Sequence, residues 1–189
     1  MSATASPFGV RAVYHPSGTI RTRTMSGFTS IPSAAVYKGD LVKLTGDGAI
    51  AAIIAANDAA FGIFDGCRYN DATGKPTYSP YWPASLSGVT QIEWYVIPFD
   101  PVLECEVQCG GAVAVTAIGD SADVVIAAGN VNTGISGTSM NSSLKGAAAV
   151  GNLRILGLAP YQDNAWGVAY TIVRVQIAKN QILTEVNSL

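Results

Sequence analysis

The sequence has few of the side chains that carry most enzyme chemistry. Its 189 residues include one histidine, His15, and three cysteines, and only 13% of them are charged, whereas soluble domains average about 25%. It contains no EF-hand, phosphate-binding loop or dinucleotide-binding glycine motif. His15 precedes a proline in a turn-rich segment, where no packed scaffold would hold it beside a nucleophile. We therefore expect a protein that is not an enzyme and that holds no cofactor and no metal.

Membrane and nucleic-acid partners are also not expected. The most apolar stretch, residues 49–56, is much shorter than the roughly 20 residues of a membrane-spanning helix. Residues 1–7 lack the basic and apolar regions of a secretory signal. Residues 1–39 carry Arg11, Arg21, Arg23 and Lys38 and no carboxylate, but three arginines without an aromatic stacking platform bind nucleic-acid phosphates poorly.

What the chain does have is apolar surface. Hydrophobic residues make up 49% of the sequence and the mean hydropathy is +0.29. So little charge on so apolar a chain is best explained if much of the surface faces other protein subunits. The composition therefore predicts an assembly component, an oligomer.

The fold is predicted to be all-β. Short runs with period-2 or continuous apolar character are separated by Gly, Asp and Pro turns, which favours antiparallel neighbours in a β-barrel, a β-tulip or a sandwich. We expect an extended N-terminal arm over residues 1–30 and a β-rich body over residues 31–189, with loop inserts near residues 70–88 and 130–143 and a short helix near 141–150. The expected strands are residues 41–45, 49–54, 61–64, 92–97, 102–109, 112–117, 124–126, 153–158 and 170–177.

Alternation within residues 102–109 predicts which side chains face the core. Cys105 and Cys109 fall on the inner face as buried free thiols, too far apart along one strand to form a disulfide, and Cys67 has the same parity as its apolar neighbours. Glu104 and Glu106 fall on the outer face. They are about 7 Å apart, a spacing that a paired-carboxylate mechanism could use, but a solvated or subunit-facing surface is favoured.

A short echo links residues 38–42 with residues 118–124. Both segments place Gly-Asp before an apolar run. Because Gly-Asp at a strand entry is common turn chemistry, we favour that explanation over an internal duplication.

Two parts of the chain resemble a family of tailed-bacteriophage head decoration, or capsid cement, proteins. The first comprises FGVRAVYHPSGTIR (residues 8–21) and YKGDLVKL (37–44); the second comprises LRILGL (153–158), Asp163-Asn164-Ala165 and VRVQIA (173–178). The resemblance implies a virion structural protein on the outer capsid surface, a homotrimer that clamps neighbouring subunits of the major capsid protein. It implies capsid contacts in the basic arm, at Phe8, Arg11, Tyr14, His15, Arg21 and Arg23.

The alternative is a carbohydrate-binding or host-adhesion module on the virion surface. Exposed aromatic side chains stack on sugar faces, and the insert at residues 70–88 carries Tyr78, Tyr81 and Trp82. Aromatic residues beside prolines more often pack a loop onto its own body, so this alternative is the weaker hypothesis.

Overall fold

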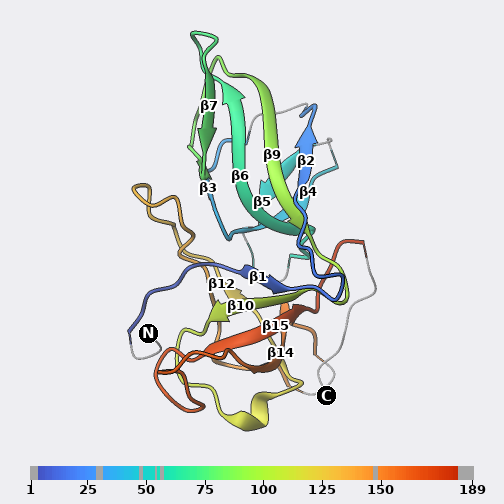
Figure 1. The fold of residues 1–189 in the computed structure, drawn as a ribbon, viewed down its shortest axis with the longest axis vertical. Coiled ribbons are helices and arrows are strands. Elements are labelled where there is room, and N and C mark those ends of the chain that lie inside the picture. The colour runs from blue at the N-terminus through green and yellow to red at the C-terminus, as the bar shows by residue number, and fades with distance from the viewer. Residues whose placement is uncertain are drawn as a thin grey trace.

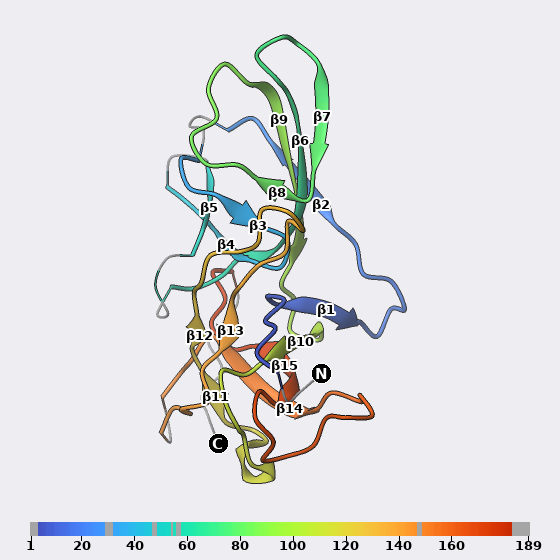
Figure 2. The ribbon, with the colours of Figure 1, turned by 90° about the vertical axis from the view of Figure 1, so that its left-hand side faces the viewer.

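The computed structural model describes residues 4–28, 32–46, 49–53, 55, 58–146 and 149–182. Within these ranges the protein is all-β, as predicted, and its named sheets are antiparallel. One sheet has the order β2-β9-β6-β4-β5 with β7 beside β6, a second has the order β1-β10-β15-β14-β11, and two small ribbons pair β3 with β8 and β12 with β13. The two large sheets lie one above the other along the long axis (Figures 1 and 2). No closed barrel is present in the described part.

The strands of the upper sheet and its ribbon come from the first half of the chain. They are β2 (Arg23–Ser26), β3 (Val36–Tyr37), β4 (Leu41–Leu44), β5 (Ile50–Ala52), β6 (Gly62–Asn70), β7 (Pro76–Ser79), β8 (Tyr81–Trp82) and β9 (Thr90–Pro98). The lower strands are β1 (Arg11–Tyr14), β10 (Glu104–Gln108), β11 (Ser121–Ala122), β12 (Val124–Val125), β13 (Ser139–Met140), β14 (Leu153–Leu158) and β15 (Ile172–Ile177), with a single 3-10 turn, η1 (Val115–Ala117), as the helical element of the described residues.

Two hydrophobic clusters fill the body. The upper cluster is aromatic: Phe64, Trp82 and Trp94 are fully buried and their rings meet edge-on or tilted, with centroids 5.0 Å and 5.7 Å apart. The lower cluster is mainly aliphatic and extends to the underside of the upper sheet, where it includes Leu41 and Ile63. The two sheets therefore share buried surface at the level where they meet.

The two large sheets contain the same arrangement of four strands, and we call each arrangement a unit. In the first unit the strand order is β2-β9-β6-β4, and in the second it is β10-β15-β14-β11, so each strand has a counterpart with the same neighbours. The irregularities also correspond: the β6·β9 ladder shifts register between Phe64 and Gly66, and the β14·β15 ladder shifts between Ile155 and Gly157. The Gly-Asp echo in the sequence thus lies at equivalent turns of the two units, where turn chemistry at a strand entry accounts for each pair.

Backbone hydrogen bonds confirm the equivalence at the Gly-Asp turns. Gly39 N–H donates to Phe64 O and Phe64 N–H donates to Asp40 O; Gly119, Ile155 and Asp120 make the same two bonds in the second unit. Both glycines have positive φ, 94° and 95°, a conformation that costs any other residue energy. The shared turn is therefore the sequence feature that starts β4 and β11.

The N-terminal arm is not confirmed in the described residues. β1 pairs with β10 and β2 pairs with β9, so residues 4–28 supply an edge strand to each large sheet. Val10 is buried in the lower cluster, and Met25 and Phe28 pack against the upper one. The lack of apolar alternation that suggested an arm instead reflects edge strands, which bury only part of one face.

The inserts and the third middle strand also differ from the predictions. Residues 70–88 are not a loop: Asp71 accepts backbone N–H bonds from Thr73 and Lys75, and this turn folds β7 back onto β6. Residues 130–143 include β13. Residues 112–117 do not form a strand, because the chain turns through η1 to reach the Gly119 turn. No helix forms in the described part of residues 141–150, where residues 147 and 148 lie outside the description.

Candidate functional site

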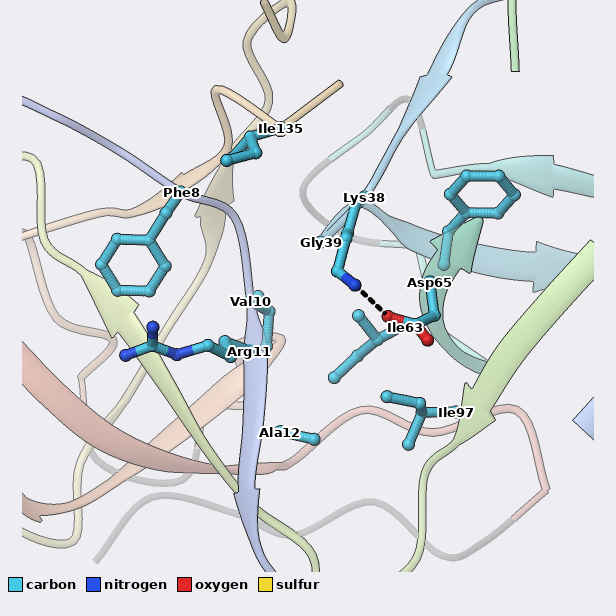
Figure 3. Close-up of a pocket in the computed structure, with 11 residues that line it drawn as sticks. Phe8, Val10, Arg11, Ala12, Lys38, Gly39, Ile63, Asp65, Ile97 and Ile135 are labelled. Atoms are coloured by element: carbon cyan, nitrogen blue, oxygen red, sulfur yellow. Dashed lines mark ion pairs between the residues drawn. The ribbon is translucent and has the colours of Figure 1, made fainter. Parts of the chain in front are cut away.

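The N-terminal segment crosses the level between the two units, beside an apolar cleft. Val10 N–H donates to Gly39 O, which ties the segment to the first unit, while β1 continues along β10 of the second. The cleft has a volume of about 340 Å³ and is lined by Phe8, Val10, Ala12, Ile63, Ile97 and Ile135 among others. The ion pair between Lys38 Nζ and Asp65 Oδ1, at 2.8 Å, stands at its edge (Figure 3).

Arg11 is held by a buried carboxylate. Its guanidinium donates to Glu106 Oε2 at 2.8 Å and also contacts the Tyr161 hydroxyl, which donates to the same Glu106 oxygen at 2.5 Å. The hydrogen bond that Arg11 donates to Glu106 raises the pKa of Arg11, and burial raises the pKa of Tyr161. Arg11 also lies over the Phe8 ring, 5.0 Å from its centroid. Both residues therefore serve to hold the N-terminal segment on its own body.

The outward placement of Glu106 is a wrong prediction. Glu106 is only 3% exposed and Cys105, Val107 and Cys109 are fully buried, so β10 is covered on both faces. Alternation cannot reveal this, because it assumes one solvated face. Arg11 and Tyr161 come from distant parts of the sequence and neutralise and hydrogen-bond the carboxylate. Glu104 lies 3.5 Å from Arg174, whose guanidinium also lies 3.8 Å from Glu106, so the two glutamates share this arginine.

His15 is also engaged within the chain. Its Nε2 lies 3.3 Å from Asp100 Oδ2 and its Nδ1 2.7 Å from the Ser17 hydroxyl. The pKa of Asp100 is lowered, first by the N–H of Val102 and then by His15. The histidine thus closes one side of a groove of about 480 Å³ that runs to Ile20 and Arg21.

Four of the six predicted contact residues are exposed: Arg11, which is already paired with Glu106, and Tyr14, Arg21 and Arg23. Tyr14 is 49% exposed, and Arg21 and Arg23 are exposed and have no ion-pair partner among the described residues. Ile20, 37% exposed, immediately precedes Arg21 in the sequence. We call Tyr14, Ile20, Arg21 and Arg23 the basic strip; it runs from the end of β1 into β2.

The predicted aromatic platform does not assemble. Trp82 is fully buried and its indole N–H donates to Pro32 O at 2.9 Å, so its assignment to an exposed platform is wrong. Tyr81 stacks on Tyr37 with centroids 5.5 Å apart. Tyr78 alone is widely exposed, at 70%, and it packs against the Arg68 guanidinium. The short β7 and β8 pairings turn these rings toward different surroundings, which the sequence pattern did not show.

A second buried carboxylate joins the two units and was not singled out by the sequence. Asp40 Oδ1 accepts from Ser136 at 2.5 Å and from Thr138 at 3.2 Å, and Oδ2 accepts from the Tyr37 N–H at 2.8 Å. Burial raises the pKa of Asp40. The loop insert predicted near residues 130–143 supplies Ser136 and Thr138, but nothing in its sequence indicated this contact. The Asp40 contact fastens the loop between β12 and β13, in the second unit, to the turn before β4 in the first unit.

The described residues contain no group of three or more His, Cys, Asp or Glu side chains that could hold a metal ion. Within them, no helix has the length and apolar character needed to span a membrane. No protein-family model, no curated protein and no solved structure matches this chain. Its function must therefore be argued from its own surfaces.

Proposed function

We propose that this chain is a non-enzymatic virion structural protein that binds the outside of an icosahedral phage capsid and stabilises it by clamping neighbouring major capsid subunits. The observation that carries the proposal is the basic strip, whose arginines lack partners in the described chain and lie beside the exposed edge strand β2. The resemblance of residues 8–21 and 37–44 to head decoration proteins agrees with this role.

Clamping requires binding energy and no bond-making chemistry. A protein that binds the assembled shell more tightly than free subunits adds its binding free energy to the stability of the shell by mass action. The body suits this task because backbone β-bridges join its two units at two places. One β-bridge pairs Lys38 with Ile135, and the other pairs Ala60 with Asn180. A rigid body transmits the clamp from one capsid subunit to the next.

The proposed homotrimer needs a self-contact in addition to the capsid contact. Large apolar side chains remain exposed on the second unit, among them Val115, at 54%, Ile118, at 47%, and Leu156, at 38%. The positions of Ile118 and Leu156 correspond to those of Lys38 and Asp65 in the first unit, where an ion pair stands instead. Exposed apolar side chains at positions where the first unit has an ion pair favour a subunit contact on the second unit.

The proposal is tested by light scattering of the purified protein and by co-sedimentation with capsids assembled without it. We expect a trimer that binds these capsids and raises their resistance to heat and to low salt. Arg21→Gln and Arg23→Gln, singly and together, should weaken binding, whereas Lys75→Gln on the exposed β6–β7 turn is the matched control with the same change of charge. A monomer that does not sediment with capsids would overturn the proposal.

A further inference from the structure

The two repeated units differ at one edge. In the second unit, β10 pairs with β15 on one side and with β1 on the other, where Arg11 lies opposite Glu106. In the first unit, the equivalent strand β2 pairs with β9 and ends its sheet, because no described residue pairs with its outer side. One of two equivalent edges thus carries an added strand that the other lacks.

The backbone of β2 has free groups that could accept such a strand. Phe99 N–H donates to Phe61 O, so by antiparallel alternation residues 95 and 97 of β9 face β6, and residues 94 and 96 face β2. Their partners on β2 are Met25 and Arg23. The N–H and C=O groups of Thr24 and Ser26 therefore point away from the sheet, and both residues are exposed.

The charge at this edge selects the kind of strand that fits. In the second unit the receiving strand supplies the carboxylate of Glu106 and the added strand supplies Arg11. On β2 the residue aligned with Glu106 is Thr24. Glu93, opposite Ser26, is paired with Arg68, so the unpaired charges nearby are those of Arg21 and Arg23. A second copy of β2 would bring two more arginines to the same edge, which opposes self-pairing.

We propose that β2 binds an extended, carboxylate-bearing segment of a partner protein by strand addition, as β10 binds β1 within the chain. The inference rests on the proposed function, under which the segment belongs to the major capsid protein. The added strand pairs with the outward backbone groups of Thr24 and Ser26, and its carboxylates meet Arg21 and Arg23. Main-chain pairing gives this contact its geometry and the arginines give it its preference for an acidic segment.

The test combines hydrogen exchange with a proline variant, using capsids assembled without this protein as the probe. We expect the Thr24 and Ser26 amides to exchange at least tenfold more slowly on capsids. Thr24→Pro removes an outward N–H without touching the bonds to β9, and it should weaken capsid binding at least tenfold. Ala52→Pro is the matched control at the opposite edge of the same sheet: Ile53 N–H donates to Leu41 O, so the Ala52 N–H also faces outward.

The outcomes separate this inference from the proposed function. Capsid binding with unchanged exchange at Thr24 and Ser26 would overturn strand addition and leave the capsid role standing. Concentration-dependent protection of β2 in the protein alone would overturn it in favour of a second copy. Absence of any capsid binding by the unmodified protein would overturn the proposed function and the partner named here. Hydrogen exchange keeps the test valid if Thr24→Pro fails to fold.

Discussion

Gly39 and Gly119 hold the same left-handed backbone conformation at the same point of two repeated units. Each is the third residue of a four-residue turn that the N–H of the next aspartate closes. Gly39 donates its own N–H to β6, and Gly119 donates its own to β14. The two units thus share a backbone arrangement although most of their side chains differ. At these two glycines the residue type is the same as well.

Replacing Gly39 by alanine should destabilise the protein more than replacing Gly74, which also has a positive φ but where an added Cβ meets no atom within 4 Å. The left-handed conformation costs an alanine about 1 kcal/mol or more, and at residue 39 the added Cβ would also lie 2.8 Å from Phe8 O. Gly157→Ala, where a Cβ meets no atom within 4 Å, is the control. Urea unfolding measures all three. Equal losses for the three variants would show that backbone conformation does not control these turns.

Arg11 and Glu106 should behave as an energetically coupled pair. Arg11→Gln leaves a buried carboxylate with fewer donors, and Glu106→Gln removes the partner of both Arg11 and Tyr161. Each change should lower the free energy of unfolding by about 1–3 kcal/mol. In the double variant the losses should fall short of their sum by about 0.5 kcal/mol or more. Strict additivity in this cycle would contradict the hydrogen-bonded cluster.

Asp40 should add to stability as the solution is acidified. Because burial raises its pKa in the folded protein, the folded state binds the proton more readily than the unfolded state. Its contribution is therefore greatest below the ordinary aspartate pKa and is lost as the pH rises through the raised value. Unfolding curves of the wild type and of Asp40→Asn are compared between about pH 4 and 7, a window that starts near the ordinary aspartate pKa of about 3.9. The wild type should gain stability relative to the variant as the pH is lowered across this window. A constant difference would argue against a raised pKa.

The three cysteines should be unreactive in the folded protein. Burial raises the pKa of Cys67, Cys105 and Cys109 to about 12, and the thiolate is the reactive form. Ellman's reagent should label none of them natively and all of them in urea. Cys105→Ser should lower stability by about 1–3 kcal/mol, because its hydroxyl enters an apolar site, with capsid binding unchanged. Rapid native labelling of any thiol would contradict this role as a buried filler.

Deleting residues 1–22 should damage the body as well as any binding surface. From the sequence alone we expect removal of residues 1–30 to abolish capsid binding and leave the body folded. In the structure, however, Val10 lies in the lower cluster and β1 covers the edge of β10. The deletion should lower the unfolding midpoint and promote aggregation through the uncovered edge. A truncated protein as stable as the full chain would show that β1 contributes little. Single substitutions at Arg21 and Arg23 are therefore the better test of capsid contact.

The fold class and most strands were predictable, whereas the candidate site was predictable only in part. Apolar alternation identifies β14 and β15 because neighbours on both sides impose a regular pattern. The same reasoning places Glu106 outside, since nothing local reveals that β1 and Tyr161 cover it. Trp82 was misplaced for a similar reason: its burial depends on β3, which lies far away in sequence. The exposure of Arg21 and Arg23 was predictable because exposed charge is a local property.

The two hydrophobic clusters draw on very different lengths of chain. Every residue of the aromatic upper cluster lies between Met25 and Val96, whereas the lower cluster joins Val10 to Ile177. During synthesis the first unit can therefore close its core once β9 has left the ribosome, while β1 must wait for β10 and the lower cluster for β15. The segment that crosses between the two units is thus made before the strands of both units and is among the last to be fixed in place.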